Sequence, residues 1–113
     1  MIDNLLKPEV LRSGDGESEI RFASQEQLTI PGNVMQGGII TAMLDMAMAI
    51  AAGGNLSTAS IHVEILRPVT ADFVTVSGRI TKRGRRLLFA EATMRDGDGK
   101  LLAQGGQTAV PLP

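Results

Sequence analysis

The chain of 113 residues contains no cysteine, no tryptophan and no tyrosine, and it has a single histidine. Without cysteine the protein forms no disulfide, offers no thiolate nucleophile and cannot bind zinc through sulfur. One histidine alone cannot supply a metal cluster, and both the Gly-rich nucleotide-binding motifs and the Gly-x-Ser-x-Gly elbow are missing. The sequence therefore predicts neither a metal nor a cofactor.

Length, net charge and the N-terminal segment narrow the class of protein further. The formal net charge of -1 lacks the basic surplus of a nucleic-acid-binding domain. The length suits one modest core, so residues 1–113 are expected to form a single domain. The first ten residues, MIDNLLKPEV, lack the basic start and apolar block of a signal peptide, and a cytoplasmic location is expected.

One long apolar stretch, VMQGGIITAMLDMAMAI at residues 34–50, stands out in the first half of the chain. From Gly37 to about Ala52 the residues Ala, Met, Leu and Ile dominate, and all of them favour or tolerate a helix. The Gly-Gly-Asn that follows supplies a stop that can adopt positive φ. The pattern predicts a buried helix whose only charged residue is Asp45.

This predicted helix has two different faces at 100° per residue. The sector around Asp45 holds small residues: Gly38, Thr41, Ala42, Ala49 and Ala52. The opposite side holds bulkier ones: Ile39, Met43, Met46, Ala47 and Ile50. A membrane span is the less favoured explanation. It needs roughly 20 apolar residues, and a carboxylate at its centre is energetically costly. We expect a sheet to curl around the helix and a second subunit to cover the rest.

Residues that alternate between apolar and polar predict strands on both sides of the helix. The expected strands are two short ones within residues 9–24, then 61–65, 74–80, 88–95 and 101–110. Because the connections between the last four are short, consecutive strands are expected to pair antiparallel. We also expect one helical turn at residues 1–6 and an irregular segment at residues 28–35. Together these elements predict the α+β fold class.

Asp45 is the strongest candidate for chemistry. An ionised carboxylate costs several kcal/mol to bury unless it is paired, so its place in an apolar helix needs a reason. One explanation is an exposed stripe or a structural interface pair, and the other is an acid, base or nucleophile that the small neighbouring residues leave accessible. At the start of the helix, the free amides of Gly37 and Gly38 suit a developing oxyanion.

The two features on this helix lie too far apart to act on one carbonyl within a single chain. Gly37 and Asp45 are separated by two helical turns, on the order of 10 Å. The physical argument therefore favours amide donors from one subunit and the carboxylate from another.

Three other motifs allow two interpretations each. The basic run formed by Lys82, Arg83, Arg85 and Arg86 is either a solvated turn or a phosphate site. The sequence DGDG at residues 96–99 is better explained as a hairpin turn than as a fragment of a calcium loop, which would need further ligands. His62 alternates with Ile61 and Val63, so it is expected to point to solvent or an interface rather than into the core.

Three segments together resemble a known family: QGGIITAMLDMAMA, STASIHVEILRPV and VSGRITKRGRRLLFAEATMRDGDGKLLAQG. They are similar to the hotdog-fold acyl-CoA thioesterases of the phenylacetate-pathway (PaaI-like) type, from about Leu28 to the C-terminus. The resemblance implies a long helix wrapped by an antiparallel sheet. It also implies a homodimer, often paired into a homotetramer, with active sites at the dimer interface and acyl-CoA as substrate.

The resemblance assigns roles to individual residues. The Gly37 amide would polarise the thioester carbonyl, and Asp45 of the other subunit would act as nucleophile or activate water. Thr58 would orient that water or the carboxylate. Gly38 and the basic run at residues 82–86 would contact coenzyme A, with the phosphates near the basic side chains.

Two positions depart from the family pattern and keep other functions open. Gln36 stands where a histidine is common, so its role would be positional, and Ile30 stands where an asparagine is often found. The leading hypothesis is hydrolysis of acyl-CoA thioesters. The alternatives are a non-catalytic acyl-CoA-binding module and, more weakly, hydration of an enoyl thioester, for which His62 is the only available histidine.

Overall fold

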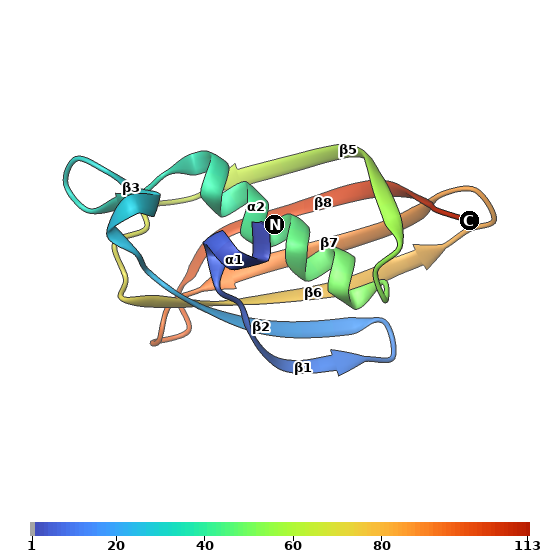
Figure 1. The fold of residues 1–113 in the computed structure, drawn as a ribbon, viewed down its shortest axis with the longest axis horizontal. Helices are drawn as coiled ribbons and strands as arrows, with labels where there is room; N and C mark the ends of the chain where they lie inside the picture. The colour runs from blue at the N-terminus through green and yellow to red at the C-terminus, as the bar shows by residue number, and fades with distance from the viewer. Residues whose placement is uncertain (1) are drawn as a thin grey trace.

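A six-stranded antiparallel sheet makes up most of the structure, a computed structural model that describes residues 2–113 (Figure 1). Its strands are β1 (Glu9–Gly14), β2 (Glu17–Ala23), β5 (Leu56–Ile65), β6 (Phe73–Arg83), β7 (Leu88–Arg95) and β8 (Leu101–Pro111). Across the sheet they follow the order β1-β2-β6-β7-β8-β5. We call the face toward the long helix the inner face and the opposite one the outer face.

Helix α2 (Gly37–Ala51) crosses the inner face of the sheet. Its buried side chains recur every three or four residues: Ile40, Met43, Leu44, Ala47, Met48 and Ala51. Met43 and Ala47 were correctly predicted on the bulky face. Ile39, Met46 and Ile50 are only partly buried, because the sheet covers the helix from one side. The predicted α+β class, with a sheet around one long helix, is confirmed.

The strands that lie under the helix show the predicted alternation. Along β6 and β7 every second side chain is buried, because successive side chains of a strand point to opposite faces. The inner face of these two strands carries Val74, Val76, Leu88, Ala90, Ala92 and Met94. These side chains, together with Ile20 and Phe22 of β2, form the core against α2.

The prediction that consecutive strands pair is right for β6, β7 and β8 but wrong for β5. Strand β5 pairs with β8, so it lies at the edge of the sheet and three strands away from β6 in the order. The connection at residues 66–72 therefore crosses from one side of the sheet to the other. It does so past the start of α2, where Val69 is buried and its carbonyl accepts a hydrogen bond from the Met35 amide at 2.8 Å.

The segment at residues 28–35 is more regular than predicted. A 3-10 turn (Glu26–Leu28) leads into β3 (Thr29–Ile30) and β4 (Val34–Met35), which pair antiparallel with each other. They can pair because Gly32 and Asn33 adopt positive φ and reverse the chain.

Two other local predictions are confirmed. The N-terminal helical turn is α1 (Ile2–Leu6), with Met1 outside the described residues. The DGDG sequence is a hairpin turn, in which Asp96 Oδ1 accepts hydrogen bonds from the amides of Asp98 and Lys100, both at 2.9 Å.

Strand β5 leaves an open edge on the sheet. Ile61 and Ile65 lie on its inner side, and they are 38% and 46% exposed. An uncovered strand edge presents unpaired backbone amides and carbonyls that another chain can pair with. No helix within residues 2–113 has the length and apolar character needed to cross a membrane.

Candidate active site

Asp45 and Thr58, two of the residues predicted from the sequence, meet in the structure. Asp45 lies half-buried in the middle of α2, and its Oδ1 accepts a hydrogen bond from the Thr58 hydroxyl at 3.1 Å. Thr58 is the third residue of β5, and it follows the loop that connects α2 to this strand. The carboxylate is therefore held by a neutral donor from the sheet and remains partly exposed within the protomer.

A β-bulge in β5 aims the Thr58 side chain at the helix. The pairing with β8 shifts between Thr58 and Ser60, so that Ala59 is the extra residue. Without the bulge, Thr58 and Ser60 would point to the same face. Instead, Thr58 reaches Asp45 on the inner face, whereas the Ser60 hydroxyl lies 2.8 Å from that of Thr108, away from the helix.

Gln107 is a third member of this cluster, which was not predicted from the sequence. Its Oε1 lies 2.7 Å from Thr58 Oγ1, and the residue is 6% exposed. Gln107 lies on the inner side of β8, where its neighbours two residues away are Gly105 and Ala109. A polar side chain among small residues on the buried side of a strand was the available signal.

The start of α2 is capped by Gln36. Its side-chain Oε1 accepts a hydrogen bond from the Ile39 amide at 3.1 Å, and its backbone is extended. The first amides of a helix have no intrahelical acceptor. The cap occupies the amide of Ile39, the third helical residue, while Gly37 and Gly38 come before it. In this protomer the Gln36 side chain therefore serves as the N-cap of α2.

Gly38 leaves room for the Gln36 side chain. A Cβ at Gly38 would lie 2.9 Å from Gln36 Oε1, and Gly38 itself is exposed. Next to it, a Cβ at Gly37 would be in ordinary contact with Ile65 Cδ1, at 3.5 Å. The N-terminal end of α2 therefore lies beside the polar Gln36 side chain and the apolar Ile65 side chain of the same protomer.

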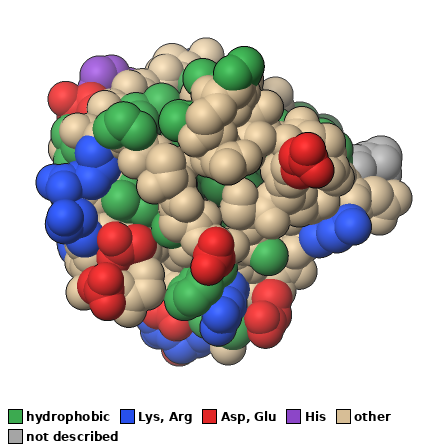
Figure 2. Space-filling model, turned by 90° about the vertical axis from the view of Figure 1, so that its left-hand side faces the viewer, with side chains coloured by type: hydrophobic (Ala, Val, Ile, Leu, Met, Phe, Trp, Pro, Cys, Tyr) green, Lys and Arg blue, Asp and Glu red, His purple; other side chains and the backbone are tan. Residues whose placement is uncertain are grey.

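One protomer does not bring Gly37 and Asp45 together. They are eight residues apart on one straight helix, which corresponds to roughly 12 Å along its axis. Figure 1 shows α2 beginning at one end of the molecule and running toward the other. The end at which it begins faces the viewer in Figure 2, where acidic and basic side chains both appear.

The basic run lies at the same end of the sheet as Thr58. Leu88, which follows the β6–β7 hairpin, is in register with Ala109 of β8, and Ala109 is in register with Thr58. The four basic side chains are exposed: Lys82, Arg83, Arg85 and Arg86. Within residues 2–113 none of them forms an ion pair with an acidic side chain. This end of the sheet thus carries uncompensated positive charge.

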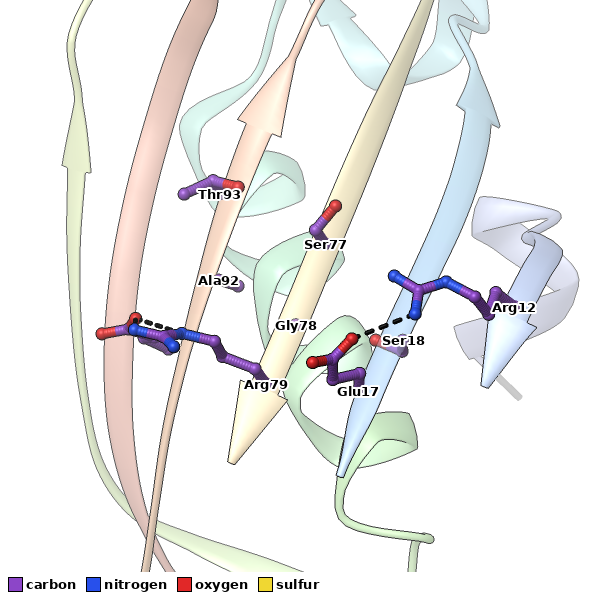
Figure 3. Close-up of a pocket in the computed structure, with 9 residues that line it drawn as sticks. Arg12, Glu17, Ser18, Ser77, Gly78, Arg79, Ala92 and Thr93 are labelled. Atoms are coloured by element: carbon purple, nitrogen blue, oxygen red, sulfur yellow. Dashed lines mark hydrogen bonds and ion pairs between the residues drawn. The ribbon is translucent and has the colours of Figure 1, made fainter. Parts of the chain in front are cut away.

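The outer face holds a hollow lined by residues of β1, β2, β6 and β7, and none of the predicted site residues line it. Figure 3 shows this hollow with α2 behind the sheet, between the ion pairs Arg12–Glu17 and Arg79–Glu91. His62 also lies on the outer side, with its side chain 77% exposed, as predicted. In the described part of the chain, no three His, Asp or Glu side chains are grouped to hold a metal ion.

Comparison with known proteins identifies the family. Residues 32–103 match the family described as the thioesterase superfamily. The chain belongs to the thioesterase superfamily. The matched range includes Gln36, Gly37, Asp45, Thr58 and the basic run, and membership supports thioester hydrolysis as the general class of reaction.

Individual proteins are similar to the chain over most of its length. Acyl-coenzyme A thioesterase THEM4 of Bos taurus is 31% identical over 74 residues, which are 65% of this chain and 31% of THEM4. Among solved structures, the conserved protein PA5202 of Pseudomonas aeruginosa has a TM-score of 0.91 and 31% identity, covering 98% of this chain and 93% of that one.

A third comparison bears on the phenylacetate resemblance. A phenylacetic acid degradation-related protein of Ralstonia eutropha JMP134 has a TM-score of 0.86 and 26% identity, covering 96% of this chain and 88% of that one. The predicted hotdog fold and the PaaI-like resemblance are confirmed.

Proposed function

We propose that this member of the thioesterase superfamily hydrolyses acyl-CoA thioesters to the free acid and CoA. The observation that carries the proposal is the hydrogen bond from Thr58 to Asp45, which holds a half-buried carboxylate in a fixed direction on the small-residue side of α2. The Gly37 amide of a second protomer polarises the thioester carbonyl. The complete site therefore lies at a homodimer interface.

The proposed reaction needs only groups that the chain supplies. Asp45 either adds to the carbonyl carbon itself or takes a proton from a water that adds there. The carbonyl oxygen becomes an oxyanion that the Gly37 N–H stabilises, aided by the positive end of the helix dipole. Collapse of this intermediate breaks the carbon–sulfur bond and releases CoA thiolate. If water was the nucleophile, this collapse gives the free acid directly, and Asp45 returns its proton to the thiolate. If Asp45 was the nucleophile, the collapse leaves an anhydride between Asp45 and the acyl group, which one water then hydrolyses to the free acid.

Two features of β5 support the dimer that this site requires. The edge of β5 that faces away from β8 has no partner strand within residues 2–113 along its ten residues. On the inner face, Ile61 and Ile65 are exposed in the protomer. Pairing of two such edges would cover these side chains and place the two α2 helices side by side. A second copy would then bring its Gly37 toward Asp45. We also propose that two such dimers pair, as the family resemblance implies.

The basic run is the proposed contact for the CoA phosphates. Four exposed cations without acidic partners lie at the end of the sheet that carries Thr58. Charge-assisted contacts with phosphate are the stronger class of hydrogen bond. The fixed forks of Arg85 and Arg86 suit phosphate oxygens in particular.

Replacing both Arg85 and Arg86 by alanine is expected to raise the KM for an acyl-CoA about tenfold. The same variant should keep its KM for the corresponding N-acetylcysteamine thioester, because that substrate carries no phosphate. Lys100→Ala, an exposed cation in the turn at the opposite end of β7, is the matched control. Equal KM values for wild type and the double variant with acyl-CoA would contradict the assignment of these residues.

A panel of acyl-CoA thioesters, followed with a thiol reagent, tests the proposed function itself. The chain has no cysteine, so all thiol signal comes from released CoA. We expect turnover of at least one thioester of small or medium acyl length. Binding without turnover across the whole panel would instead indicate an acyl-CoA-binding module. Release of CoA at the rate of the buffer, without binding, would contradict both functions.

A further inference from the structure

We propose that Gln107 is a positioning residue that directs the Thr58 hydroxyl proton to Asp45. This inference rests on the proposed function of Asp45 and adds a member to the site. Thr58 Oγ1 lies 3.1 Å from Asp45 Oδ1 and 2.7 Å from Gln107 Oε1. Both distances are within hydrogen-bond range, so Thr58 stands between the carboxylate and the amide.

The number of protons decides the direction of these contacts. The Thr58 hydroxyl has one proton, whereas an ionised carboxylate and an amide oxygen only accept hydrogen bonds. With Gln107 Oε1 toward Thr58, the hydroxyl can serve only one of its two neighbours. A half-turn of the terminal amide exchanges oxygen and NH2, which have nearly the same shape. Gln107 Nε2 then donates to Thr58 Oγ1, and Thr58 donates to Asp45.

The resulting relay favours a charged and oriented Asp45. Each hydrogen bond in the chain polarises the next, so the amide dipole of Gln107 acts on the carboxylate through the Thr58 hydroxyl. Thr58 is also fixed in rotation, because it accepts from one side and donates to the other. The carboxylate oxygen that Thr58 does not hold remains directed at the substrate.

The position of Gln107 in the fold supports a function rather than simple packing. Burying an amide without good hydrogen bonds is unfavourable in proteins. Gln107 and Ser18 are the two buried polar residues within residues 2–113, and Ser18 binds a helix carbonyl. Gln107 is in register with Ile61 of β5 and Ala90 of β7, so its amide lies between the sheet and the helix near Asp45.

A double-mutant cycle tests whether Gln107 acts through Thr58. Gln107→Met keeps the length of the side chain and removes its amide, and Thr58→Val keeps the shape of Thr58 and removes its hydroxyl. We expect each single variant to lower kcat for acyl-CoA hydrolysis roughly tenfold to a hundredfold with KM within twofold. The double variant should be no slower than Thr58→Val alone. Independent, multiplying losses would overturn the proposal, as would an unchanged kcat in Gln107→Met.

Conservative variants separate the relay from a general loss of structure. Thr58→Ser keeps the hydroxyl and is expected to keep most of the wild-type kcat, and in that background Gln107→Met should again be costly. Thermal unfolding of each variant accompanies the kinetics. A Gln107→Met loss that tracks the unfolding temperature, and not the presence of a hydroxyl at position 58, would assign Gln107 to the core only.

A second measurement needs neither catalysis nor a change at Gln107. In 15N-labelled protein, the side-chain NH2 resonances of Gln107 are compared between wild type, Thr58→Val and Asp45→Asn. If Nε2 donates to Thr58, its proton shift moves in both variants and its exchange with water quickens in Thr58→Val. Unchanged Gln107 resonances in Thr58→Val would overturn the relay. Because this result does not depend on turnover, it distinguishes failure of the relay from failure of the proposed function.

Discussion

Asp45→Asn is expected to abolish thioester hydrolysis while the fold stays intact. The amide has nearly the shape of the carboxylate and can still bond to Thr58, but it neither takes a proton nor adds to a carbonyl carbon. We expect kcat to fall roughly 10²–10⁴-fold, to the background of the assay. Asp45→Ala should lose as much, because both changes remove the basic carboxylate. Initial rates with the best substrate of the panel measure the effect.

The control for this change is Asp98→Asn, which removes the charge of an exposed aspartate in the β7–β8 turn. Its rates should equal those of the wild type. Circular dichroism and thermal unfolding verify that Asp45→Asn remains folded. Turnover of Asp45→Asn at the wild-type rate would exclude Asp45 as the catalytic group.

Asp45→Asn also tests whether each site is built from residues of two protomers. We combine it with Gly37→Pro. Gly37 is the first helical residue, where proline is tolerated, and Gln36 already has the extended backbone that a residue before proline prefers. The change removes the amide hydrogen with little effect on the helix, and kcat should fall roughly 10²–10³-fold. Each variant alone is therefore expected to be inactive.

Mixing the two inactive variants should restore activity. In a mixed dimer, one site combines the intact Gly37 of one chain with the intact Asp45 of the other, while the second site has both defects. Random pairing after joint refolding makes half of the dimers mixed, so about one quarter of the wild-type activity is expected. If the mixture stays inactive although mixed dimers form, Gly37 and Asp45 do not cooperate across protomers.

Local patterns were enough to predict most of the fold. The helix at α2 and the alternation along β6 and β7 follow from periodicity, which depends on neighbours a few residues away. The pairing of β5 does not. A short connection favours neighbouring strands, but residues 66–72 cross the sheet because Val69 is buried beside the start of α2. Long-range packing of this kind leaves no periodic signal in one sequence.

The site residues, too, could be predicted only where the signal is local in the sequence. Asp45 was conspicuous as one charge in an apolar helix, and the resemblance to a family added Thr58. The β-bulge that turns Thr58 toward Asp45 depends on the register with β8, which sequence spacing does not give. Gln107 is 49 residues from Thr58 and was overlooked, because its polarity has meaning only once the inner side of β8 is known.

Gly78→Ala is expected to destabilise the protein strongly, because the sheet touches the helix backbone at this point. A Cβ at Gly78 would lie 2.6 Å from the carbonyl carbon of Ala47, closer still to its oxygen, and 3.0 Å from the Met48 amide. The neighbouring Ser18 Oγ donates to the same Ala47 oxygen at 2.6 Å. The three atoms nearest to the new Cβ all belong to the backbone of α2, which lies behind Gly78 in Figure 3. No side chain can therefore swing away from them, and the helix itself must move.

The sign of the effect makes this prediction sharp. In an unobstructed strand, replacing glycine by alanine stabilises a protein by roughly 0.5–1 kcal/mol through the entropy of the unfolded chain. Overpacking against a fixed backbone costs on the order of 3 kcal/mol, so the unfolding temperature should fall by on the order of 10 °C. Ser77→Ala, one residue earlier and on the outer face, should stay within about 0.5 kcal/mol of the wild type.

Gly78→Ala also connects the packing of the helix with catalysis. Ala47 lies two residues after Asp45, so a helix that moves away from β6 carries the carboxylate with it and lengthens its contact with Thr58. The folded fraction of Gly78→Ala should therefore show a lower kcat than Ser77→Ala at a temperature where both are folded. A Gly78→Ala protein that unfolds at or above the wild-type temperature would show that the contact with Ala47 does not limit how closely the sheet and helix approach.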